Sequence, residues 1–163
     1  MHAKDAVKIG LVSTQNMLSM YLEDLSDQDL TVRPVPSANN IAWQMGHLIE
    51  GEGHLGSALP GATYPALPDS IKGQYGKGTA ESSPAAGYLT KAQYLDWFNK
   101  MRNASIAIVE KMTDADLDKP NTGSMAKFAP RIADLIVLMT NHTMMHAGQF
   151  TVTRRALNKP IIM

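Results

Sequence analysis

Residues 22–30 read LEDLSDQDL, and residues 109–117 read VEKMTDADL, 87 positions further along the chain. Each copy places Ser or Thr three residues ahead of an Asp, a variant of the capping box that begins a short helical turn. The dipeptide Ile-Ala then follows each copy, at 41–42 and at 132–133. This ordered repetition predicts two helix–turn–helix halves packed with approximate two-fold symmetry.

Four longer segments have apolar residues at helical spacing, and alternation of the kind found in strands is absent. We expect these helices to cover residues 5–25, 41–59, 91–112 and 130–158. Ser37 or Asn39 is the expected cap of the second helix, Thr90 caps the third, and Pro130 lies in the first turn of the fourth. The sequence therefore predicts an all-α fold, a four-helix bundle with a pseudo-two-fold internal repeat.

The predicted second and third helices are joined by a long crossover loop, residues 60–88, which is rich in Gly, Pro and Ser. Loops longer than about 12–15 residues are usually functional or mobile. Tyr64, Tyr75 and Tyr88 could wall a ligand pocket in this loop. A solvated connector is the alternative interpretation.

Length, charge and hydropathy indicate a single domain and argue against nucleic-acid-binding, secreted and membrane proteins. The 163 residues fit one domain, which we assign to 1–163. Fifteen basic and fifteen acidic residues give no net charge, which argues against a nucleic-acid partner. The amino terminus lacks the apolar run of a secretory signal and no segment has the length of a membrane span, so we expect a cytoplasmic protein without a membrane partner.

Three histidines are the candidate metal ligands. The chain has no cysteine, so a metal site must use His, Asp or Glu. His142 and His146 are four residues apart on the fourth predicted helix and leave the same face of it. The second predicted helix carries His47, and the pseudo-two-fold axis would bring these two helices together in the bundle. We therefore expect His47, His142 and His146 to bind one divalent ion.

Three neutral imidazoles would leave a coordination position open, which is the arrangement of catalytic zinc. Water or a substrate anion could enter there, and the ion would lower the pKa of bound water or hold a thiol as thiolate. Gln44 and Gln149 could orient the imidazoles or the bound water; the alternative for both is a polar residue at a helix surface. Glu50 and His54 could each be a fourth ligand or a general base, but the Gly-Glu-Gly sequence around them predicts a position near a frayed helix end. We therefore expect them to be bystanders or supporting groups.

The segments Trp43-Gln-Met-Gly-His47-Leu and Asn141-His142-Thr-Met-Met-His146-Ala-Gly-Gln149 resemble the DinB-like superfamily of damage-inducible four-helix bundles, which is also grouped with metal-dependent hydrolases. The resemblance covers the chain from the first helix to Asn158. It places the family's metal histidines at His47, His142 and His146. Many relatives carry His-His-Arg-Gly-Gln where this chain has Met145-His146-Ala147-Gly148-Gln149, so a role for the extra histidine and the arginine in gripping an anionic substrate is lost here.

The resemblance implies a divalent ion, often zinc or nickel, and commonly a homodimer. It also implies a range of activities, among them transfer or isomerisation chemistry with a small thiol, and the family includes members with no assigned reaction. Our leading hypothesis is a metal-dependent enzyme that acts on a small-molecule substrate, with low-molecular-weight-thiol S-transferase chemistry. The alternatives are a hydrolase that uses metal-bound hydroxide and a non-catalytic metal-binding stress or scaffold protein.

Overall fold

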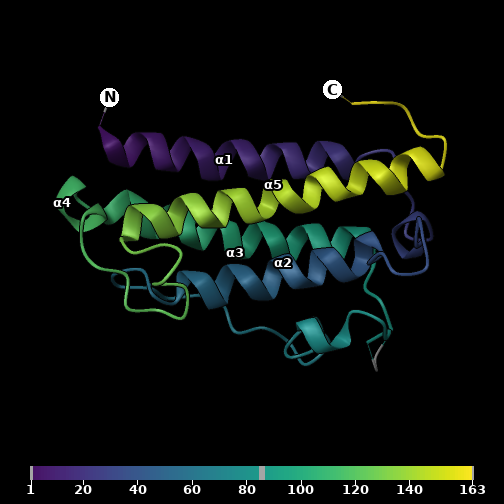
Figure 1. Cartoon of the computed structure of the whole chain (residues 1–163), viewed down its shortest axis with the longest axis horizontal. Coiled ribbons are helices and arrows are strands. Elements are labelled where there is room, and N and C mark those ends of the chain that lie inside the picture. Colours follow the sequence, from purple (N-terminus) through teal and green to yellow (C-terminus); the bar gives the residue numbers. More distant parts are fainter. Residues whose placement is uncertain (1, 85–86, 163) are drawn as a thin grey trace.

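The computed structural model describes residues 2–84 and 87–162 and is almost entirely helical (Figure 1). No strand occurs in this part of the chain. The four long helices are α1 (Ala3–Leu22), α2 (Ile41–Gly56), α3 (Lys91–Lys111) and α5 (Ile132–Ala156). The short elements are the 3₁₀ turns η1 (Asp29–Thr31) and η2 (Lys77–Thr79) and the helix α4 (Asp114–Leu117). The predicted all-α four-helix bundle is confirmed.

The helix packing has the expected pseudo-two-fold arrangement. Helix α1 packs against α5 and α3, and α2 packs against α3 and α5. Exchanging α1 with α3 and α2 with α5 maps this set of interfaces onto itself, which is the signature of two similar halves. Helices α1 and α2, although consecutive in sequence, therefore lie diagonally across the bundle, and the two second helices, α2 and α5, face each other directly.

The repeated sequence forms the same local structure in both halves. The Ser26 N–H donates to the Asp29 carboxylate while the Asp29 N–H donates to the Ser26 hydroxyl, at 2.8 and 3.1 Å. Thr113 and Asp116 exchange the equivalent bonds at 2.7 and 3.2 Å. These reciprocal bonds satisfy backbone donors where a long helix gives way to a short turn, as a capping box does.

The helix ends differ from the predicted ones in detail. Asn40, rather than Ser37 or Asn39, caps α2, because its side chain accepts the Trp43 N–H at 2.8 Å. Thr90 caps α3 as predicted, by accepting from Gln93. Pro130 lies before the cap residue of α5, outside its first turn. A proline fits there equally well, since no helical N–H is required of it.

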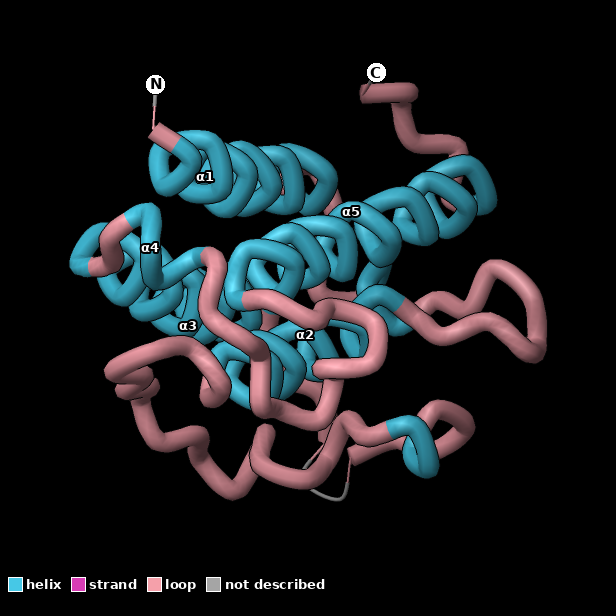
Figure 2. The backbone as a smooth tube through the Cα atoms, turned by 60° about the vertical axis from the view of Figure 1, so that its left-hand side comes forward, coloured by secondary structure: helices cyan, strands magenta, loops and turns pink. Residues whose placement is uncertain are grey.

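The crossover between α2 and α3 runs along the outside of these two helices, below them in Figure 2. The Tyr75 hydroxyl lies 2.8 Å from that of Tyr94, and the Tyr64 hydroxyl lies 2.8 Å from Ser105 Oγ. The hydroxyl of Tyr88 accepts from the Asn40 side chain. The three loop tyrosines thus hold the crossover against the bundle rather than wall a pocket, which corrects both the pocket and the solvated-connector interpretations.

Among the described residues, no helix is both long and apolar enough to cross a membrane.

Candidate metal centre

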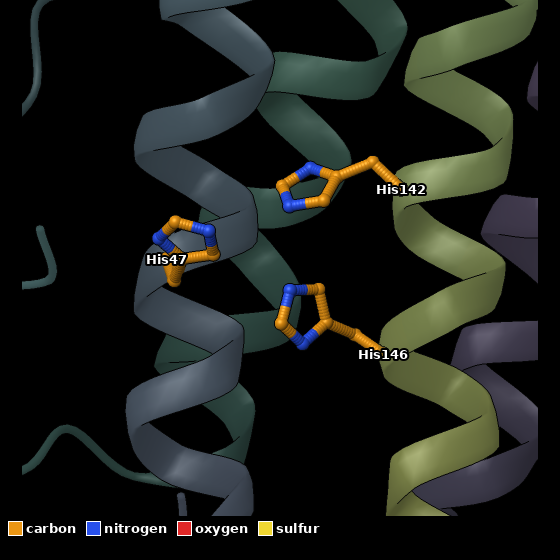
Figure 3. A group of neighbouring side chains, drawn as sticks. All are labelled: His47, His142 and His146. Atoms are coloured by element: carbon orange, nitrogen blue, oxygen red, sulfur yellow. The ribbon is translucent and has the colours of Figure 1, made fainter. Parts of the chain in front are cut away.

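The rings of His47, His142 and His146 converge in the space between α2 and α5 (Figure 3). Their centroids lie 4.9 to 5.3 Å apart, and one ligand nitrogen from each ring lies within 4.8 Å of the others. Helix α5 supplies two rings from successive turns, and α2 supplies the third because the pseudo-two-fold packing sets these helices side by side. The three predicted ligands are therefore brought together.

His146 is oriented by a buried glutamine. Its Nδ1 lies 2.9 Å from Gln44 Oε1, and the Gln44 Nε2 donates to the Asn39 carbonyl at 3.0 Å. Since an amide oxygen only accepts, the proton of the ring resides on Nδ1. The Nε2 of His146 is buried and has no hydrogen-bond partner among the described residues. A metal ligand needs a free lone pair, and the Nε2 of His146 has one that no other group in the described chain uses.

His47 is held by the crossover and by its own helix. Its Nδ1 donates to the main-chain carbonyl of Tyr75 at 2.9 Å, which leaves the Nε2 lone pair for a ligand role. The indole of Trp43, one turn earlier on α2, stacks on the ring at 5.0 Å between centroids with the planes 9° apart. Both the tautomer and the ring plane of His47 are thus defined.

His142 packs against a glycine of the opposite helix. A Cβ added to Gly51 would lie 3.1 Å from Cε1 of His142, so the absence of a side chain at Gly51 makes room for the ring. The Gly-Glu-Gly sequence does not fray α2, contrary to the prediction, because the helix continues to Gly56. Close packing, rather than weak helix propensity, accounts for this glycine.

Burial and the neighbouring rings keep the α5 histidines neutral. Burial, with His47 and Arg102 nearby, lowers the pKa of His142 to about 4. Burial, with the repulsion that His142 and His47 would exert if protonated, lowers the pKa of His146 to about 3. Both side chains are therefore neutral at pH 7, which is the state in which an imidazole binds a metal.

A buried ion pair lies beside this cluster and was not predicted from the sequence. Arg102 of α3, which is fully buried, donates to the carboxylate of Glu52 at 2.9 Å and to the hydroxyl of Thr143 at 2.6 Å. The other oxygen of Glu52 accepts from Ser105 Oγ. Thr143 directly follows His142 in α5, so this network packs α3 against the two helices that carry the histidines.

The remaining candidates do not join the cluster. His54 is exposed, and its Nε2 lies 2.9 Å from Ser124 Oγ. Glu50 accepts the main-chain N–H groups of Gln74 and Tyr75 in the crossover. Gln149 is exposed and, with Gln44, lines a surface cavity of about 280 Å³. Of the candidates beyond the three histidines, Gln44 bonds the Nδ1 of His146, and a hydrogen bond with Gln149 raises the pKa of His146 against the larger effect of burial.

The donor set fits a divalent ion. Two of the three rings have Nδ1 committed to a carbonyl acceptor, so their Nε2 atoms are the donors. Neutral nitrogen donors of this kind suit zinc and other first-row transition metals. Three protein ligands leave a tetrahedral ion one further position.

Residues 11–150 match the model of the DinB superfamily. The chain belongs to the DinB superfamily. No curated protein matches the sequence.

Two solved structures have the same fold as this DinB-superfamily chain. A conserved protein from Enterococcus faecalis superposes with a TM-score of 0.72 at 16% identity, over 97% of this chain and 98% of its own. YfiT from Bacillus subtilis superposes with a TM-score of 0.67 at 15% identity, over 96% and 89% of the two chains. YfiT is described as a probable metal-dependent hydrolase with an unusual four-helix bundle topology. At this level of identity the likeness shows the fold.

Proposed function

We propose that this DinB-superfamily protein is a metal-dependent enzyme in which His47, His142 and His146 hold one divalent ion, zinc or nickel. The observation that carries the proposal is the buried Nε2 of His146, which has no hydrogen-bond partner among the described residues and faces two other imidazoles. Leaving a buried acceptor unpaired costs about 1–3 kcal/mol, and a bound ion removes that cost.

A low-molecular-weight thiol is the proposed substrate. A divalent ion in this cluster supplies Lewis acidity that favours the thiolate form of a thiol at neutral pH. The residues of the chain hold the geometry: Gln44 and the Tyr75 carbonyl fix two of the rings. The thiol sulfur would attack an electrophilic carbon, forming the carbon–sulfur bond as the leaving group departs with its electron pair.

Metal content tests the proposed site. We expect about one equivalent of zinc or nickel in the wild type by elemental analysis, and strong loss of it in His142→Ala. The control His54→Ala should keep its metal, because that side chain is exposed and its Nε2 lies 2.9 Å from Ser124 Oγ. Equal metal content in wild type and His142→Ala would overturn the site.

A panel of small thiols with a bimane-type electrophile tests the chemistry. We expect conjugation that depends on both the metal and one thiol of the panel. Conjugation at the same rate without metal, for every thiol, would contradict S-transfer. Full metal occupancy with no turnover on broad panels would instead indicate a binding protein.

A hydrolase is the second candidate, and the description of YfiT as a probable metal-dependent hydrolase favours it. In that reaction water, in place of the thiol, attacks an amide or ester carbonyl, and the leaving group departs protonated. Product release without any added thiol would support hydrolysis over S-transfer. His142→Ala should abolish this release as well, because both reactions use the same metal.

We also propose that the protein is a homodimer, as is common among the proteins it resembles. Light scattering on the purified protein should then give twice the 17.7 kDa of the chain. A mass of one chain at micromolar concentration would contradict the dimer without affecting the metal site.

A further inference from the structure

The crossover loop touches the metal cluster through residues 74–79, which we name the clasp. The ring of Tyr75 is fully buried and lies against Gly46 of α2, where an added Cβ would come within 2.4 Å of it. This close approach is possible only because position 46 has no side chain. It brings the main chain of Tyr75 down to the surface of α2, beside His47.

Glu50 holds the main chain of the clasp from α2. Its Oε1 accepts the N–H of Gln74 and its Oε2 accepts the N–H of Tyr75, both at 3.2 Å. The carbonyl of the same Tyr75 accepts the Nδ1–H of His47 at 2.9 Å. Glu50 and His47 lie three residues apart on one face of α2, so the clasp forms a hydrogen-bonded bridge from the carboxylate to the imidazole.

A second connection reaches the face of the same ring. Trp43, which stacks on His47, donates its indole N–H to Thr79 Oγ1 at 3.1 Å. The hydroxyl of Thr79 donates to the carbonyl of Gln74 at 2.7 Å. The clasp therefore contacts both the edge of the His47 ring, through Tyr75, and the tryptophan that covers its face.

We propose that Glu50 is a positioning residue that sets the tautomer and orientation of His47 through the main chain of Tyr75. The proposal rests on the proposed metal site, although Glu50 does not touch the metal position itself. A carboxylate on two adjacent N–H groups makes charge-assisted bonds, which are stronger than neutral ones. Without them the Tyr75 carbonyl is no longer held against Nδ1, and His47 can take either tautomer or rotate away.

Two substitutions at position 50 test this role by removing one or both of the acceptor oxygens. Glu50→Gln keeps one acceptor oxygen and should give an intermediate effect, whereas Glu50→Ala keeps none. We expect zinc affinity, measured by competition with a chromophoric chelator, to fall by about 10–100-fold in Glu50→Ala, as is usual for partners of ligating histidines. Glu81→Ala, which removes an exposed carboxylate from the same crossover, should bind zinc like the wild type.

A second readout does not depend on the metal. In the metal-free protein, ¹⁵N chemical shifts of the imidazoles should show His47 with its proton on Nδ1. The two tautomers should mix in Glu50→Ala, while His146, which is held by Gln44, keeps its tautomer. A general loss of structure would disturb both rings, so an effect on His47 alone identifies positioning.

The outcomes separate this inference from the metal proposal. Wild-type zinc affinity together with a wild-type His47 tautomer in Glu50→Ala would overturn the role of Glu50 and leave the metal site standing. Absence of zinc binding in the wild type would overturn the metal site, and the tautomer measurement would still decide whether Glu50 positions His47. If Glu50→Ala does not fold, Glu50→Gln decides by the same two measurements.

Discussion

The Nδ1 of His146 donates to Oε1 of Gln44 across the interface between α5 and α2, at 2.9 Å. The amide of Gln44 is itself oriented, because its Nε2 donates to the carbonyl of Asn39 just before the helix cap. The start of α2 thereby determines which nitrogen of a buried imidazole on α5 remains available. The main chain next to the cap of α2 thus orients His146 through the side chain of Gln44.

Replacing Gln44 with leucine should weaken metal binding. The apolar side chain leaves the Nδ1–H of His146 buried without an acceptor, so the ring loses its fixed tautomer. We expect zinc affinity to fall by about 10–100-fold and the free energy of unfolding to fall by about 1–3 kcal/mol. Chelator competition and urea denaturation measure the two effects. Gln28→Leu is the control, since Gln28 is exposed in the turn just before η1; an equal loss of affinity in both variants would contradict the role of Gln44.

Gly51→Ala should have two separate effects, a gain in the helix propensity of α2 and a loss of zinc affinity. Alanine favours a helix over glycine by about 1 kcal/mol, but its Cβ would lie 3.1 Å from Cε1 of His142 and 3.5 Å from Nδ1. The ring must shift to relieve this contact, and we expect zinc affinity to fall on the order of tenfold.

Gly148 of α5 is the matched control for Gly51. A Cβ added there meets nothing within 4 Å, so Gly148→Ala should raise the free energy of unfolding by about 0.5–1 kcal/mol without changing zinc affinity. Thermal melts of the metal-free proteins and chelator competition are the measurements. Unchanged affinity in Gly51→Ala would show that His142 tolerates the added methyl group.

The three histidines could be predicted from the sequence because two properties of the chain determine their places. The i, i+4 spacing puts His142 and His146 on one helix face, and the internal repeat pairs their helix with the one that carries His47. The supporting groups could not be found in this way. Every residue has a carbonyl, so nothing in the sequence marks that of Tyr75 as the acceptor for His47.

Two further features depend on contacts that a sequence does not show. Glycine at positions 46 and 51 indicates a weak helix when α2 is considered alone, whereas in the fold each admits a ring from another element. Glu52 and Arg102 are 50 positions apart and each resembles a surface residue of an amphipathic helix. They form a buried ion pair only because α2 and α3 pack together.

Breaking the buried pair from one side should strongly destabilise the protein. Glu52→Gln leaves the guanidinium of Arg102 without a countercharge in a fully buried position. We expect the free energy of unfolding to fall by about 3–5 kcal/mol. The double variant Glu52→Leu/Arg102→Met should lose less than either of its single variants, Glu52→Leu or Arg102→Met. Urea denaturation measures all four variants.

An exposed ion pair provides the control. Lys100 and Asp96 on α3 are about half exposed, so Lys100→Ala should cost less than about 1 kcal/mol. Losses that simply add in the Glu52→Leu/Arg102→Met double variant would show that the two buried charges do not stabilise each other.

Acid should destabilise the metal-free protein through the α5 histidines. Their pKa values are lowered by burial to about 4 for His142 and about 3 for His146, against 6.5 for an ordinary histidine. Below pH 6.5 these two histidines therefore become protonated in the unfolded chain, while in the folded chain they stay neutral until the pH approaches 4 and 3. The stability associated with neutral rings is complete above pH 6.5 and is lost as the pH falls toward 4 and then 3.

Replacing both histidines isolates their contribution to the pH dependence of the free energy of unfolding. Two protons correspond to a slope of up to about 2.7 kcal/mol per pH unit in the free energy of unfolding between about pH 5.5 and 4. The double variant His142→Gln/His146→Gln cannot take up these protons, so its slope should be smaller by that amount. Urea denaturation of both metal-free proteins from pH 4 to 7.5 measures the difference. Parallel stability curves would mean that the two rings are protonated as easily in the folded chain as in the unfolded one, and that burial between α2 and α5 does not keep them in the neutral form that a metal needs.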